Sequence, residues 1–337
     1  MFQHSMKRYT TIAFCMLFFA FVGKQNLFVV PKNFPPPVYD FKNNPLSVHK
    51  IFLGRTLFYD PILSTNNTIS CESCHSPFSA FTHIDHALSH GINDSIGTRN
   101  SPALMNLAWQ KSFMWDGAIH NLDMQALAPI SHPAEMGSNM KEVVEKLNTS
   151  PKYRQLFYQA YKDSVASGEN TLKAISQFML TLVSANSKYD QVMRNEVSFT
   201  EQEFNGYLLF KKNCASCHTE PLFTNGNFEN NGLPIDTQLQ DLGRMRITGM
   251  AQDSLKFKVP SLRNIAYSFP YMHDGRFKKL TDVLNHYSKG IVASKTLLPQ
   301  LNGNFTLNSN EKVDLISFLL TLSEKEFVFN PKFQYPK

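Results

Sequence analysis

Two short cysteine and histidine motifs carry the most chemistry in this sequence. Cys71-Glu-Ser-Cys-His75 and Cys214-Ala-Ser-Cys-His218 each place two cysteines three residues apart, with a histidine directly after the second one. Cysteines at this spacing can form thioethers to the two vinyl groups of one porphyrin, and the histidine can then bind its iron. The pattern predicts two covalently bound c-type haems, attached through Cys71, Cys74, His75, Cys214, Cys217 and His218.

A zinc site or a thiol redox pair is the alternative for each motif, since Cys-x-x-Cys pairs occur in both. The histidine that follows each pair favours haem. The remaining cysteine, Cys15, lies in the N-terminal stretch, so no pair of cysteines is left for a structural disulfide. We therefore interpret both motifs as haem attachment sites.

A stretch downstream of each haem motif is repeated. Residues 99–117 recur in altered form as residues 258–275, and matched positions are 158 residues apart. The residues that keep this spacing are Pro102 and Pro260, Asn106 and Asn264, Asp116 and Asp274, Gly117 and Gly275, and Leu122 and Leu280. The chain is therefore a duplication of one haem module, and differences at matched positions should show how the two haems differ.

The length and composition fit a globular protein of two domains. The 337 residues are 42% hydrophobic, which is enough for sizeable cores, and a chain of this length favours two domains over one. The net charge of +6 is a mild excess without a Lys/Arg-rich block, so no binding of nucleic acid is expected.

Residues 1–25 have the parts of an export signal. Lys7 and Arg8 precede an apolar run, residues 11–22, which is too short to span a bilayer as an ordinary helix. An export signal is the first interpretation. Because no clean small-residue cleavage site follows, an uncleaved N-terminal anchor is the alternative. Both alternatives predict a periplasmic location.

Helical patterns surround both haem motifs. Three consecutive prolines indicate an extended linker within residues 26–44. Apolar spacing and capping residues predict helices over residues 45–61, 123–128, 151–161, 170–189, 200–213, 280–287 and 311–322. No run of alternating strands appears. The predicted class is mainly α, with two cytochrome c-like domains, residues 45–192 and 193–337, each with one covalently bound haem.

Five further motifs lie in a fixed order around the haem motifs. They are Leu53-Gly-Arg-Thr-Leu-Phe-Tyr-Asp60, Arg99-Asn-Ser-Pro102, Trp115-Asp-Gly117, Pro133-Ala-Glu-Met-Gly137 and Pro270-Tyr-Met-His-Asp-Gly275. In this order they closely resemble the bacterial di-haem cytochrome c peroxidase family, which includes the MauG-type enzymes, over about residues 45–325. The resemblance implies that hydrogen peroxide is cleaved at the N-terminal haem, that the C-terminal haem receives electrons, and that a tryptophan lies between them.

The resemblance assigns three residues to catalysis. The bridging tryptophan is Trp115, the distal glutamate is Glu135, and its hydrogen-bonding companion is Gln125, at intervals of ten residues. A carboxylate close to iron can take a proton from one peroxide oxygen and return it to the other. Without the family, Trp115 would be an ordinary core aromatic, and the other two would be ordinary surface residues.

The resemblance also gives the two haems different second ligands. In the family a methionine, or in MauG-type members a tyrosine, binds the C-terminal iron fourteen residues after the histidine of Pro-Tyr-x-His, which is Tyr287 here. The matched position of the first module is Pro129, which has no side-chain donor, so we expect that haem to be open. Ordinary members close it at rest with a histidine where this chain has Ile92. Three histidines of the same loop are alternatives for that role: His83, His86 and His90.

A calcium ion between the domains is a further implication of the resemblance. In the family it is bound by an asparagine side chain and by backbone carbonyls, which suit a hard cation. The corresponding residues are Asn100, Ser268 and Pro270. Carbonyl ligands leave almost no signature in a sequence, and Asn100 is equally typical of a turn.

The resulting prediction is a periplasmic di-haem peroxidase that reduces hydrogen peroxide with electrons from a small cytochrome c or copper protein. One alternative is a MauG-type oxidant that modifies a partner protein, which Tyr287 and Ile92 favour. Against it, both tryptophans, Trp109 and Trp115, belong to the first module, so neither can relay oxidation from the second haem outward. A second alternative is a dihaem electron-transfer protein without turnover. A homodimer is compatible with each of these.

Overall fold

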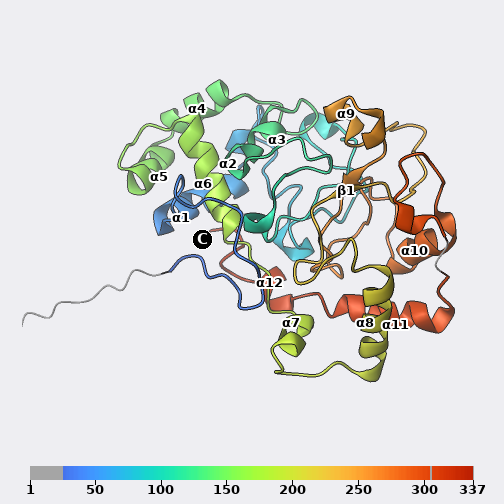
Figure 1. The fold of residues 1–337 in the computed structure, drawn as a ribbon. Helices are drawn as coiled ribbons and strands as arrows, with labels where there is room; N and C mark the ends of the chain where they lie inside the picture. Colours follow the sequence, from blue (N-terminus) through green and yellow to red (C-terminus); the bar gives the residue numbers. More distant parts are fainter. Residues whose placement is uncertain (1–25, 304–305, 337) are drawn as a thin grey trace, which may run out of the picture.

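The computed structural model describes residues 26–303 and 306–336, and helices dominate it (Figure 1). The α-helices are α1 (Val48–Tyr59), α2 (Leu122–Gln125), α3 (Leu127–Ser131), α4 (Met140–Thr149), α5 (Pro151–Tyr161), α6 (Gly168–Leu180), α7 (Lys188–Met193), α8 (Glu201–Asn213), α9 (Met245–Thr248), α10 (Leu280–Asn285), α11 (Ser309–Leu320) and α12 (Lys325–Val328). Strands β1 (Phe228–Glu229) and β2 (Phe257–Lys258) form a short antiparallel pair. The predicted mainly α class is confirmed.

Each haem motif follows a helix that crosses a later helix of the same module. Helix α1 packs against α6, and α8 packs against α11. Both crossings depend on a glycine: a Cβ on Gly54 would lie 1.8 Å from the carbonyl oxygen of Ala174, and one on Gly206 would lie 1.9 Å from that of Asp314. The duplication therefore extends from the motifs to the helix pairs that position them.

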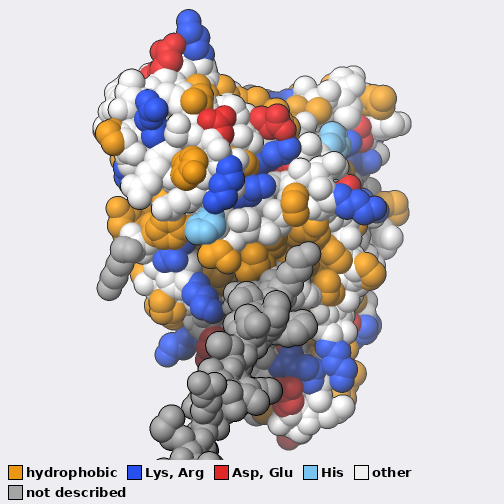
Figure 2. Space-filling view, turned by 90° about the vertical axis from the view of Figure 1, so that its left-hand side faces the viewer, with side chains coloured by type: hydrophobic (Ala, Val, Ile, Leu, Met, Phe, Trp, Pro, Cys, Tyr) orange, Lys and Arg blue, Asp and Glu red, His pale blue; other side chains and the backbone are white. Residues whose placement is uncertain are grey.

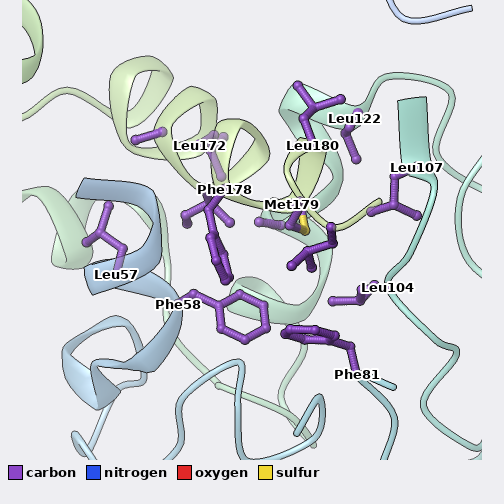
Figure 3. Close-up of a cluster of buried hydrophobic side chains, with 14 of the residues drawn as sticks. Leu57, Phe58, Phe81, Leu104, Leu107, Leu122, Leu172, Phe178, Met179 and Leu180 are labelled. Carbon is purple, nitrogen blue, oxygen red and sulfur yellow. The ribbon is translucent and has the colours of Figure 1, made fainter. Parts of the chain in front are cut away.

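Two clusters of buried hydrophobic side chains lie beside these helix pairs. The first combines α1, α6 and the loop after the first haem motif, and it includes Leu57, Phe58, Phe81 and Phe178 (Figure 3). The second is rich in aromatic residues and includes Tyr189, Phe210, Phe223 and Phe318. Full burial of one such side chain contributes about 1.5–3 kcal/mol, so each module has a substantial core of its own.

The last described residues return to the first module. Helix α12 and Phe333 belong to the first hydrophobic cluster. The Tyr59 hydroxyl donates to the carbonyl of Phe333 at 2.5 Å, and Arg55 Nε donates to the carbonyl of Gln334 at 2.6 Å. Figure 1 accordingly shows the C-terminus beside α1. Residues 324–336 thus pack on the first module, although they fall in the range predicted for the second domain.

The repeated stretch has the same backbone shape in both modules. An isolated bridge pairs Phe113 with Ile119 in the first and Tyr271 with Phe277 in the second, again 158 residues apart. Positive φ angles recur at three matched pairs, which are Asn106 and Asn264, Met114 and Met272, and Gly117 and Gly275. The repeat therefore specifies a loop, and this loop lies next to each haem motif.

Charged side chains join the two modules. Arg99 donates to Asp116 of its own module at 2.6 Å and to Asp241 of the second module, also at 2.6 Å. Arg244 donates to the carbonyl of Asp116 at 2.9 Å, and its guanidinium lies 3.9 Å from the centre of the Phe228 ring. Removing one partner of such a part-buried pair leaves an uncompensated charge, so these contacts fix the position of one module against the other.

Several helices differ from the sequence prediction, which missed α9 and α12 altogether. The helix expected over residues 170–189 is wrong in its second half, because α6 ends at Leu180 and α7 begins separately. A capping box between Ser187 and Asp190 begins α7 by satisfying free backbone N–H groups of a new helix. Helix α4 was not predicted, although its N-cap, Asn139, is a typical one.

The surface and the N-terminal stretch complete the description. On the face at the left of Figure 1, hydrophobic side chains gather in the middle, with Lys and Arg side chains scattered around them (Figure 2). No helix within residues 26–303 and 306–336 is long and apolar enough to cross a bilayer. The predicted export signal, residues 1–25, lies outside the described residues.

Candidate haem sites and the region between them

The first haem motif presents a histidine that is ready to bind a metal. The backbone N–H of His75 donates to the carbonyl of Cys71 at 2.9 Å, and its ring Nδ1 lies 2.8 Å from the carbonyl of Phe81. Burial lowers the pKa of His75 to about 4, so the ring is neutral at pH 7. Because a carbonyl only accepts, Nδ1 carries the hydrogen, and Nε2 keeps its lone pair for iron.

The second motif repeats this arrangement. The backbone N–H of His218 donates to the carbonyl of Cys214 at 2.9 Å. Its Nδ1 lies 3.1 Å from the carbonyls of both Phe223 and Pro260, and burial lowers the pKa of this histidine as well. The carbonyl of Pro102, which matches Pro260, lies close enough to the ring of the first histidine to raise its pKa. The repeated proline thus has a function that its spacing alone did not reveal: its carbonyl orients the metal ligand.

A cavity of about 690 Å³ extends from the second motif to the junction of the modules. Cys214, Cys217 and His218 line it, and its apolar walls include Leu262, Leu284, Leu315 and Leu319. This volume is typical of cofactor sites, and apolar walls with two thiols and a neutral histidine fit a covalently attached porphyrin. Zinc fits poorly, because a structural zinc needs four ligands and no group of three or more His, Cys, Asp or Glu in the described chain could hold a metal ion.

Tyr287 lines the same cavity as His218. It lies in a π-helical turn, His286–Gly290, that directly continues α10. Burial raises its pKa to about 12, while a hydrogen bond from the side chain of Asn231 at 3.4 Å acts in the opposite direction. The structure therefore brings the predicted second ligand and the motif histidine to one cavity, and it adds an amide donor at the phenol oxygen.

Trp115 also lines this cavity, at its junction end. Its indole N–H donates to the carbonyl of Asn100 at 2.8 Å, and its own carbonyl accepts from the backbone N–H of Lys258, in β2, at 2.7 Å. These bonds tie the tryptophan to both modules. Its role as a bridge between the two haems stays a prediction.

Glu135 lies near the first motif. Burial raises its pKa, and its charge in turn raises the pKa of the Cys74 thiol, so the two side chains are close. His132 lies 3.8 Å from the carboxylate and partly opposes the effect of burial. The carbonyl of Glu135 accepts from the N–H of Ile92 at 2.8 Å, which anchors this loop. A carboxyl with a raised pKa beside a haem motif suits proton transfer.

Gln125 lies at the end of α2, and its side-chain amide donates to the sulfur of Met114 at 3.7 Å. Met114 directly precedes Trp115 and belongs to the repeated loop, so Gln125 contacts the loop that carries the tryptophan. Its role as the companion of Glu135 stays a prediction.

The matched proline and the loop histidines are placed as follows. Pro129 lies inside α3, and its carbonyl accepts from the N–H of Met136 at 3.2 Å. Ile92 is buried. The rings of the three loop histidines stack in series, with centroids 5.2 Å apart for His83 and His86 and 4.1 Å apart for His86 and His90. The Cys74 thiol donates to the carbonyl of His90 at 3.4 Å, so this loop lies against the first motif.

The residues predicted to bind calcium, Asn100, Ser268 and Pro270, line the cavity together with Trp115. The amide nitrogen of Asn100 donates to the carbonyl of Ala87 at 2.9 Å, which leaves the side-chain oxygen as its donor for a cation. Calcium binding by this group stays a prediction.

Lys258 is a partly buried residue that the sequence did not single out. Its ammonium donates to the side-chain oxygen of Gln110 at 2.9 Å and to the carbonyl of Ser112 at 2.8 Å. Burial lowers its pKa to about 8, and the charge of Asp116 partly opposes this effect. These bonds hold in place the segment from Gln110 to Ser112, which precedes Trp115. The only signal in the sequence was its place in the repeat, at the start of residues 258–275.

Comparison with known proteins gives the same picture. A family model described as di-haem cytochrome c peroxidase matches residues 48–198. The methylamine utilization protein MauG of Methylorubrum extorquens is 35% identical over 304 residues, which is 87% of this chain and 82% of that protein. Cytochrome c551 peroxidase of Nitrosomonas europaea is 34% identical over 290 residues, covering 84% of this chain and 81% of that protein.

A solved structure of a MauG-like protein associated with microbial copper homeostasis is similar in fold, with a TM-score of 0.80 and 32% identity, covering 91% of this chain and 98% of that one. The fold and the motifs define a largely helical protein with two c-type haem motifs. The chain belongs to the di-haem cytochrome c peroxidase and MauG family. Membership confirms the predicted resemblance and implies two c-type haems and an oxidoreductase.

Proposed function

We propose that this chain is a periplasmic di-haem peroxidase that reduces hydrogen peroxide to water at the His75 haem, with electrons entering through the His218 haem. The observation that carries this proposal is an asymmetry between two sites built alike. Both histidines direct Nδ1 at backbone carbonyls, but Tyr287 lines the cavity that His218 also lines, whereas the matched position of the first module is Pro129.

The bound haems would supply the redox chemistry, since their iron can bind peroxide and pass electrons. Glu135 would serve the proton transfer, since its carboxylate can take a proton from one peroxide oxygen and give it to the other. Its raised pKa supports this role because a more basic carboxylate holds the proton better between the two events. Reduction to water consumes two electrons and two protons in all.

Trp115 is the proposed connection between the sites. It lines the cavity that begins at Cys214 and His218, and hydrogen bonds to both modules hold it in place. Lys258 and Asn100 act as positioning residues, because each bonds to the backbone or the indole of the tryptophan. Electrons from a small cytochrome c or copper protein would follow this route toward the first site.

A MauG-type oxidation of a partner protein is the second candidate. Two observations favour it. Tyr287 lines the same cavity as His218, and the buried Ile92 occupies the position of the usual resting-state histidine. The proteins most similar in sequence include both peroxidases and MauG proteins. A calcium ion at Asn100 and a homodimer are compatible with either function.

The ferric holoprotein provides the test. Electron paramagnetic resonance should show one high-spin and one low-spin haem, because Tyr287 would bind the second iron whereas Pro129, at the matched position of the first module, has no side-chain donor. Two low-spin haems that remain so after reduction would instead support a carrier without turnover. A long-lived near-infrared band after addition of peroxide would select the MauG-type oxidant over the ordinary peroxidase.

A further inference from the structure

The repeated loops of the two modules share a feature beyond the repeated motifs. Met114 and Met272 are matched residues with φ angles of 68° and 74°. Each accepts a hydrogen bond from a side-chain amide at its sulfur: Gln125 Nε2 lies 3.7 Å from the sulfur of Met114, and Asn231 Nδ2 lies 3.6 Å from that of Met272. The second module therefore has its own counterpart of Gln125.

This counterpart comes from a different part of the second module. The position that matches Gln125 in the repeat is Val283, in α10, which cannot form the bond. Asn231 lies instead in the loop after β1. The same contact has thus been made from an unrelated place in the chain, which is why the spacing of motifs did not show it.

The Asn231 amide also contacts the proposed iron ligand. Its Nδ2 lies 3.4 Å from the hydroxyl oxygen of Tyr287, so one amide group faces both the phenol and the thioether of Met272. The side-chain oxygen accepts from the backbone N–H of Leu233 at 3.2 Å. Because a backbone N–H only donates, this bond identifies the amide oxygen and leaves the nitrogen directed at Tyr287.

The backbone around Asn231 is firmly held. Its carbonyl accepts from Nε2 of the buried His286 at 3.1 Å, which ties the loop to the π-helical turn that carries Tyr287. The neighbouring Asn230 donates to the hydroxyls of Ser294 and Thr296, both at 2.9 Å. An amide fixed in this way can control the position of the phenol rather than follow it.

We propose that Asn231 is the positioning residue of the second haem site, which holds the Tyr287 oxygen toward the cavity and limits its electron donation to iron. This inference rests on the proposed role of Tyr287 as a ligand. A hydrogen-bond donor draws electron density from a phenolate oxygen, so it weakens the stabilisation of ferric iron by that ligand. The sulfur of Met272, which accepts from the same amide, also lines the cavity and has a lone pair that could bind iron in place of the phenol.

The test uses ferric holoprotein carrying Asn231→Leu. Loss of the donor should move the phenolate-to-iron charge-transfer band to longer wavelength and lower the reduction potential of the second haem. Replacement of this band by a thioether-ligated spectrum would also support the proposal, since the amide that holds the phenol in place would be gone. Asn231→Gln keeps a donor and should stay close to the parent protein. A band and potential identical to the parent in Asn231→Leu would overturn the inference.

Matched variants separate positioning from general disturbance. Asn225 lines the same cavity, and its amide donates to the carbonyl of Ser216 at 3.2 Å, so Asn225→Leu should leave the band in place. If Asn231→Leu yields no holoprotein, Asn231→Asp keeps the acceptor for Leu233 but lacks the donor, and Asn225→Asp measures the effect of the added charge. A shift of the band in Asn231→Asp no larger than that in Asn225→Asp counts against the inference.

Tyr287→Phe distinguishes the failure of this inference from that of the proposed function. Loss of the charge-transfer band in Tyr287→Phe with no change in Asn231→Leu would reject Asn231 alone. A band that persists in Tyr287→Phe would reject the ligand role on which the inference rests.

Discussion

Single residues make the two haem sites alike on one side and different on the other. His75 directs Nδ1 at the carbonyl of Phe81, His218 directs Nδ1 at the carbonyls of Phe223 and Pro260, and the matched Pro102 carbonyl lies near the first ring. The two sites differ in their other side chains: Glu135 lies near the first motif, and Tyr287 lines the cavity of the second. Because these two side chains come from unmatched parts of the chain, substitutions there should affect one site at a time.

Glu135→Gln should preserve both haems but slow the reduction of peroxide. The amide keeps the size of the side chain and cannot accept the proton, and general acid–base assistance contributes on the order of 10²–10⁴-fold to a rate. Steady-state turnover with a reduced donor measures the loss, and the absorbance of the pyridine haemochrome confirms the haem content. Turnover equal to that of the parent protein would remove Glu135 from the mechanism.

The rate should also depend on pH through the same group. Burial raises the pKa of Glu135, and the carboxylate that accepts the proton exists only above that pKa. The value of kcat/KM for peroxide should therefore fall as the pH is lowered, with a midpoint above the ordinary glutamate value of about 4.3. In Glu135→Gln this limb of the profile should disappear. A limb that survives the substitution belongs to another group, such as His132, which faces the carboxylate.

Helix pairs set the distance between each haem motif and its core. The α1–α6 and α8–α11 crossings bring backbones into contact at Gly54 and Gly206. Helix α8 ends at Asn213, directly before Cys214, so a shift at the second crossing would move the cysteines of that motif.

Gly206→Ala should weaken the second module more than the first. The added Cβ would lie 1.9 Å from the carbonyl oxygen of Asp314, so α8 and α11 must separate, at a cost of about 1–3 kcal/mol or more. Thermal unfolding and the occupancy of the second haem would show the loss. Gly303→Ala is the control, since a Cβ there meets nothing within 4 Å. Equal melting temperatures for the two variants would contradict the crossing argument.

The sequence predicted these elements unevenly, and the reason is physical. Strong local signals, such as the capping box of α8 and the proline at the start of α5, placed helices correctly. The apolar pattern after residue 170 continues across the break between α6 and α7, so it predicted a single helix. The capping box of α7 instead begins a second helix there. Asn231 was invisible because its partners, Met272 and Tyr287, are distant in the chain.

At the scale of the whole molecule, the duplication is not a division into two independent halves. Phe327, Val328 and Phe333 pack into the first core, and Arg99 pairs with an aspartate of the second module. The haem-motif repeat indicated two modules, but nothing in its spacing indicated that the tail returns. Contacts between chain ends depend on the packing of the complete fold, which local patterns do not encode.

Phe327→Ala should therefore destabilise the first module although the residue belongs to the C-terminal tail. The side chain is 1% exposed within the first hydrophobic cluster, and a cavity of this kind costs about 3–5 kcal/mol. Chemical denaturation followed by the absorbance of each haem would detect the change. The neighbouring Phe329 is 46% exposed, so Phe329→Ala should have a much smaller effect. Equal effects of the two substitutions would argue against docking of the tail.

The return of the tail also has a consequence for the order of events during biosynthesis. The Tyr59 hydroxyl and the carbonyl of Phe333, to which it donates, are 274 residues apart in the chain, so this part of the first core forms only after the second module between them has been made. Contacts between such distant residues form slowly, because closing a long loop costs conformational entropy.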